Sequence, residues 1–196
     1  MNSDILSTLK NTTGPLHKRL EKGMNMLDPS LSPTDYLHLI KAFWGYYRPF
    51  EANLARVPAL QTYLPDIALR SKLPWLETDL KALELNDAAL DKLPICQALP
   101  TCTDLSTALG CLYVAEGSTL GGQMLSRHFK DLLNLDVETG AAFFMGYGAQ
   151  TGGMWQTFRE ALMSAPVDED AVIHAACETF ITLEHWLCPF TLMTEE

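Results

Sequence analysis

The chain has 196 residues, and its 24 acidic side chains outnumber its 14 basic ones to give a formal net charge of −10. This length suits a single domain, over residues 1–196, that closes its core without disulfides or a metal. The acidic balance argues against nucleic acid or an anionic membrane surface as a main partner, so we expect neither.

Cysteine usage and the first residues indicate the compartment. The five cysteines form no C-x-x-C pair and make an odd total, which favours a reducing environment. The N-terminus lacks the basic region and apolar run of a secretion signal, and no apolar stretch approaches the ~20 residues of a membrane span. The predicted localisation is therefore cytoplasmic.

Apolar residues recur at helical spacing along the whole chain. Residues 3–27 form the first predicted helix, with a bend at Pro15 just before His17. Ser32 begins a long helix that runs to about Arg56. Two further helices are predicted over residues 67–85, with a break near Pro74, and 86–93. A central helix then begins at a cap, Thr103 or Asp104, and runs to about residue 133. The last three predicted helical elements are 136–147, 154–163 after a glycine junction, and 168–187. The fold class is therefore all-α, with about seven or eight helices.

The central helix carries Gly117, Gly121 and Gly122 in its interior. Each interior glycine costs about 0.5–1 kcal/mol relative to alanine. One interpretation is close packing, because Gly117 and Gly121 share a face that a neighbouring helix could approach. The other is that the bare backbone bends over a flat ligand. The glycines alone leave both interpretations open.

His17 and Glu21 are four residues apart and share one helix face. A histidine that binds a metal through one ring nitrogen usually donates its other N–H to an acceptor, and Glu21 is placed to be that acceptor. An ordinary surface pair has the same spacing, as His174 and Glu178 show. The remaining histidines are expected to be packing or surface residues: His38, His128 and His185.

Several common chemistries lack their motifs in this sequence. There is no Glu-x-x-His, which argues against a carboxylate di-iron centre. There is also no G-x-S-x-G elbow, P-loop or G-x-G-x-x-G fingerprint. Hydrolase and nucleotide chemistry therefore lose support.

Three ordered blocks, residues 13–21, 109–123 and 143–155, resemble bacterial biliverdin-forming haem oxygenases, above all those associated with bacterial phytochromes. The resemblance covers nearly the whole chain and implies a single haem-oxygenase-like helical fold. It also implies that His17 is the proximal haem and metal ligand and that Glu21 orients it. By the same resemblance, Gly117, Gly121 and Gly122 match the distal glycines that let the backbone close over haem.

The resemblance also suggests roles for three further residues. Lys10 and Arg159 match basic positions that would pair with the haem propionates, although simple solvent exposure explains both equally well. Many haem oxygenases carry an aspartate after the first distal glycine, where this chain has Ser118. A serine hydroxyl holds a water but carries no charge, so Ser118 is a candidate catalytic residue and the other proton-delivery groups are not identified.

The predicted activity is that of an oxidoreductase that binds haem b as substrate and cofactor. O2 and electrons from a reductase or ferredoxin would open the ring to biliverdin, CO and ferrous iron, and a bacterial phytochrome would receive the biliverdin. The alternatives are a non-enzymatic haem carrier or sensor on the same fold, and a helical protein that binds another small molecule.

Overall fold

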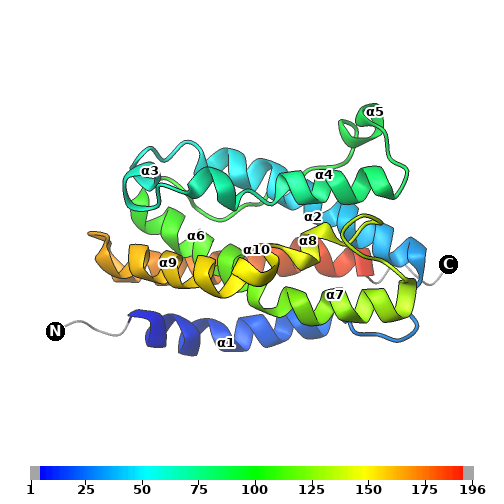
Figure 1. Ribbon diagram of the computed structural model, residues 1–196. Helices are drawn as coiled ribbons and strands as arrows, with labels where there is room; N and C mark the ends of the chain where they lie inside the picture. Colours follow the sequence, from blue (N-terminus) through cyan, green and yellow to red (C-terminus); the bar gives the residue numbers. More distant parts are fainter. Residues whose placement is uncertain (1–4, 192–196) are drawn as a thin grey trace.

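The computed structural model describes residues 5–191, with side chains to Pro189 (Figure 1). The α-helices are α1 (Ile5–Met24), α2 (Pro33–Leu54), α3 (Ala59–Tyr63), α4 (Leu73–Ala82), α5 (Asp87–Leu90), α6 (Leu105–Gly117), α7 (Thr119–Leu133), α8 (Ala142–Met145), α9 (Thr151–Ser164) and α10 (Glu169–Thr191). Two 3-10 turns are η1 (Ile67–Arg70) and η2 (Gly148–Gln150). Seven of the helices have ten residues or more. The described residues contain no strand, which confirms the all-α class.

Helix α10 is the centre of the packing and contacts α1, α2 and α6 (Figure 1). Its contact with α6 is close because Gly110 has no side chain: a Cβ there would lie 2.2 Å from the carbonyl oxygen of Val172. Its contact with α2 is fixed by two buried hydrogen bonds. The Trp186 indole N–H donates to the carbonyl of Ala42 at 2.7 Å, and a second bond of 2.8 Å joins the hydroxyls of Tyr46 and Thr182.

Capping residues set the starts of two long helices as the sequence predicts. Ser32 caps α2 through a capping box with Asp35. Asp104 caps α6, accepting the Thr107 N–H at 2.9 Å while the Thr107 hydroxyl reaches back to the backbone. Each cap satisfies N–H groups that have no partner within the helix.

Of the other predicted boundaries, one is confirmed and several were wrong. The predicted break near Pro74 is confirmed: it lies at Ser71 and Lys72, and Pro74 is in the first turn of α4, where a missing N–H costs nothing. Helix α9 begins at Thr151 and includes Gly152 and Gly153, which were predicted to belong to the junction. Helix α10 continues past Pro189 to Thr191, although Pro189 cannot donate a helical hydrogen bond. Helix α1 runs through Pro15 and ends at Met24.

The predicted central helix is divided into α6 and α7 at Ser118. Helix α6 is buried on nearly all sides, whereas α7 buries only Gly122, Ser126 and Phe129. Hydrogen bonds still cross the junction: the Ser118 N–H donates to Val114 and the Gly121 N–H donates to Ser118. The chain therefore passes from a core helix to a helix with one face free, and that change of environment falls at the glycines.

None of the described helices combines the length and apolarity needed to span a bilayer.

Candidate functional site

A cavity of about 1270 Å³ opens between α1 and the α6–α7 junction. It is larger than the ~300–1,000 Å³ typical of small-molecule pockets. Every site residue proposed from the sequence lines it: Lys10, His17, Glu21, Gly117, Ser118, Gly121, Gly122 and Arg159. The structure thus brings together residues from α1, α6, α7 and α9.

His17 and Glu21 lie on the cavity side of α1. The His17 Nε2 is 3.4 Å from Glu21 Oε1, and both side chains are about half exposed (51% and 57%). The ring also packs against Phe180 of α10, with 5.5 Å between ring centroids. His17 thus has a carboxylate near one ring nitrogen and lines the cavity.

The second histidine–glutamate pair has the same local geometry and a different surrounding. His174 Nε2 is 3.3 Å from Glu178 Oε1, but neither residue lines the cavity. Glu178 instead accepts the backbone N–H of Thr101 at 2.9 Å, and this bond holds the pKa of Glu178 below its usual value. This pair therefore fastens the loop before α6.

The glycines at the junction divide into two kinds. A Cβ at Gly121 would meet no described atom within 4 Å, and one at Gly117 would make only ordinary contacts of 3.7 Å or more with Trp155. A Cβ at Gly122 would lie 2.3 Å from the carbonyl oxygen of Phe144. Gly122 is therefore needed for the packing of α7 on α8. The packing interpretation fails for Gly117 and Gly121, which leave bare backbone facing the cavity.

Ser118 lies between these glycines, at the junction itself. Its hydroxyl donates to the carbonyl of Ala115 at 2.9 Å and also takes part in a hydrogen bond with Tyr47 of α2. Tyr47 is deeply buried, and burial raises the pKa of its phenol. Both residues line the cavity, so two hydroxyls lie close to the exposed glycine backbone.

Two basic residues proposed from the sequence also lie at the cavity. Lys10 comes from α1 and Arg159 from α9, and both are exposed. They offer two cationic groups to an anionic ligand, although the overall charge of the chain is negative.

Sequence reasoning missed a wall of the cavity that α2, α4 and α8 supply. We call it the aromatic wall; its members are Phe43, Tyr47, Trp75, Phe143 and Phe144. The rings from α2 and α8 contact one another, with 4.8 Å between the centroids of Phe43 and Phe143, whereas Trp75 contacts Tyr147. The block of residues 143–155 drew attention to Phe143 and Phe144 as part of a motif but gave no reason to place them at the site.

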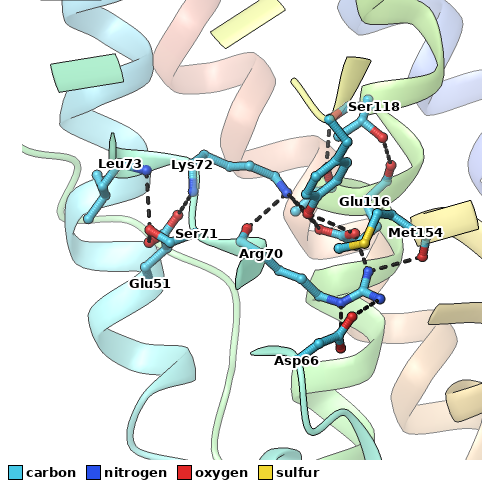
Figure 2. Close-up of polar contacts among 12 residues, drawn as sticks. Glu51, Asp66, Arg70, Ser71, Lys72, Leu73, Glu116, Ser118 and Met154 are labelled. Atoms are coloured by element: carbon cyan, nitrogen blue, oxygen red, sulfur yellow. Dashed lines mark hydrogen bonds and ion pairs between the residues drawn. The ribbon is translucent and has the colours of Figure 1, made fainter. Parts of the chain in front are cut away.

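A buried charged cluster behind this wall was also missed; its members are Asp66, Arg70, Lys72, Glu116 and Tyr147. Figure 2 shows Arg70 and Lys72 pointing at Glu116 from two sides. The exposed fractions of Arg70, Lys72 and Glu116 are 3%, 3% and 1%. A glutamate within the apolar run of residues 108–117 was the signal for it, because a buried carboxylate requires partners.

The cavity residues fit a haem. A flat apolar ring suits the aromatic wall and the bare backbone of Gly117 and Gly121, and carboxylate substituents suit Lys10 and Arg159. His17 supplies an imidazole, the usual nitrogen ligand of haem iron.

The fold and this cavity define a helical protein built to enclose a flat cofactor-sized ligand. The family model described as "Heme oxygenase" matches residues 3–187, and the chain belongs to the haem oxygenase family of enzymes. A comparison with curated protein sequences finds no match.

Solved structures share the fold at low sequence identity. The haem oxygenase of Neisseria meningitidis, in its NO- and CO-bound forms, is 22% identical with a TM-score of 0.79, and the match covers 98% of this chain and 94% of that one. The Leptospira interrogans enzyme is 19% identical with a TM-score of 0.69, over 94% and 98%. Haem oxygenase-1 from the cyanobacterium Synechocystis, in complex with haem, is 18% identical with a TM-score of 0.72, over 93% and 90%. At these identities the structures show the fold alone.

Proposed function

We propose that this chain is a single domain, residues 1–196, that opens haem b oxidatively to biliverdin, CO and ferrous iron. The observation that carries the proposal is His17 and the bare backbone of Gly117 and Gly121 at one cavity. Haem, when bound, supplies the iron at which O2 is activated and the ring that is opened. Electrons come from an external reductase or ferredoxin.

The residues of the chain have distinct roles in this proposal. His17 binds the iron as a neutral imidazole, and Glu21 accepts its other N–H and fixes the ring. Lys10 and Arg159 bind the carboxylates of the ring. Gly117 and Gly121 leave room for O2 beside bare backbone, and Gly122 keeps α7 close to α8. Ser118 holds a water through its hydroxyl.

The likeness of residues 143–155 to bacteriophytochrome-associated enzymes supports a finer proposal, that a bacterial phytochrome receives the biliverdin. The cysteine usage supports a cytoplasmic location.

The proposal is tested by titrating the purified protein with hemin and then adding a reducing system in air. We expect a stoichiometric Soret complex that decays as a biliverdin band grows in the red. A Soret complex that persists through reduction would instead identify a haem carrier or sensor, which the missing acidic group at Ser118 makes the main alternative. Absence of any complex would contradict haem binding altogether.

A further inference from the structure

The buried charged cluster is expensive for the protein to maintain. Desolvation opposes buried ion pairs, and apolar replacements are often neutral or stabilising. Glu116 is also in the last turn of α6, where the helix dipole disfavours a carboxylate. Stability alone therefore explains the cluster poorly.

Lys72 is the member of the cluster that lines the cavity. Its Nζ donates to Glu116 Oε1 at 2.6 Å, to the Tyr147 hydroxyl at 2.8 Å and to the carbonyl of Arg70 at 2.9 Å. The ammonium also lies over the ring of Trp75, 5.4 Å from its centroid. Three acceptors thus hold one proton-bearing group at the aromatic wall.

Charged and titratable groups face Lys72 from several elements. Glu116 comes from α6, Tyr147 from the segment between α8 and η2, Glu51 from α2 and Arg70 from η1. Burial lowers the pKa of Lys72, and the two carboxylates oppose that effect. Burial also raises the pKa of Tyr147, so this phenol keeps its proton.

We propose that Lys72 is the proton donor of the cavity, with Glu116 and Tyr147 as positioning residues, in place of an acidic residue at Ser118. The inference rests on the proposed function, in which oxygen reduced by the external electron donor takes up protons. One N–H of the ammonium first exchanges its bond to the Tyr147 hydroxyl for a bond to a cavity water or to oxygen derived from O2. That N–H bond then breaks, its electron pair stays on Nζ, and the proton passes to the new acceptor. The Tyr147 hydroxyl, which also donates to Glu116, can turn to donate to the neutral amine. Solvent water then returns a proton to Nζ.

A first test observes Lys72 directly, without turnover. In protein labelled with [13Cε]lysine, the Lys72 resonance is the one absent from Lys72→Arg. We expect it to titrate below the surface lysines and to shift or broaden when hemin is added. A Lys72 resonance that hemin leaves unchanged would overturn the proposal, because the group would then not face the bound ligand.

A second test separates a proton donor from a mere counter-ion of Glu116. Lys72→Arg keeps the charge but its guanidinium does not give up a proton, whereas Lys72→Met removes charge and donor together. For a donor, both variants slow single-turnover ring opening by about a hundredfold or more and change its pH profile. Their hemin Kd should stay within about threefold of the wild-type value.

The matched control is Lys81→Met, which removes an exposed lysine of α4 that pairs with Glu77 outside the cavity. It should turn over at the wild-type rate. If Lys72→Arg also turns over at that rate, Lys72 is only a counter-ion and the inference fails while the proposed function stands. A wild-type protein that forms no Soret complex would defeat the proposed function itself. Should Lys72→Met not fold, Lys72→Arg and the labelled wild type still decide the question.

Discussion

The cavity between α1 and α7 and the contact between α6 and α10 contain the same two small motifs. Each has a histidine and a glutamate four residues apart, with N–O distances of 3.4 and 3.3 Å. Each also has a glycine in a helix, Gly121 in one and Gly110 in the other. Only the first set lines the cavity, whereas His174 is exposed to solvent on α10. The motif therefore specifies a local geometry, and the surrounding helices decide what it does.

The most direct test of the difference between the two pairs is to replace each histidine in turn. We expect His17→Ala to shift the Soret band, to weaken hemin binding by about a hundredfold or more, about 3 kcal/mol, and to abolish ring opening. His174→Ala should change none of these, because its ring does not line the cavity. Hemin titration and reduction in air measure both. Equal effects from the two variants would show that the cavity does not select His17.

The glycines offer the second contrast. We expect Gly110→Ala to lower the free energy of unfolding by about 3 kcal/mol, since the new methyl would meet Val172 backbone and force α6 and α10 apart. Gly121→Ala should raise it by about 0.5–1 kcal/mol, because its Cβ meets nothing and alanine favours the helix. Urea denaturation without hemin measures both. A destabilised Gly121→Ala would mean that α7 needs this glycine for packing.

The third contrast compares the two glutamates. Glu21→Gln should lower hemin affinity or the ring-opening rate by about tenfold to a hundredfold, the usual cost of losing the acceptor behind a ligating histidine. Glu178→Gln should leave haem chemistry intact and loosen the loop at Thr101, whose N–H it accepts. Hemin Kd and amide exchange at Thr101 test the two variants. Unchanged hemin affinity and ring opening in Glu21→Gln would show that His17 and Glu21 form only an ordinary surface pair.

The same residues show which parts of the fold and the site can be predicted from the sequence. Helical periodicity and the caps at Ser32 and Asp104 are local, so the helix class and two helix starts follow from sequence. The eight site residues came from the resemblance and from local spacing, and the fold brings them to one cavity. Local patterns cannot distinguish Gly121 from Gly122, because only the position of α8 makes one of them a packing glycine.

Long-range contacts account for what was missed. Lys72 and Glu116 are 44 residues apart, and nothing near Lys72 in the sequence indicates a buried partner. Glu116 itself was visible as a charge in an apolar run, but its two cationic partners come from η1 and the start of α4.

The last contrast concerns pH, because a titrating group, Asp79, holds α8 at the cavity. Asp79 is fully buried and accepts the N–H groups of Ala142 and Phe143 at 2.6 and 2.8 Å. Burial raises the pKa of this carboxyl from 3.8 to about 6. The folded state therefore binds the Asp79 proton more tightly than the unfolded state, and the stability from this group falls as pH rises from about 4 to 6.

Between pH 4.5 and 7 that loss should be about 2 kcal/mol. Replacing the carboxyl removes it, so the stability of Asp79→Asn relative to wild type should improve by that amount across the same interval. Urea denaturation of both proteins at the two pH values measures the difference, which cancels the other carboxylates of the chain. A constant difference would show that Asp79 does not titrate there. The two hydrogen bonds from Asp79 would then hold α8 equally well across this pH interval.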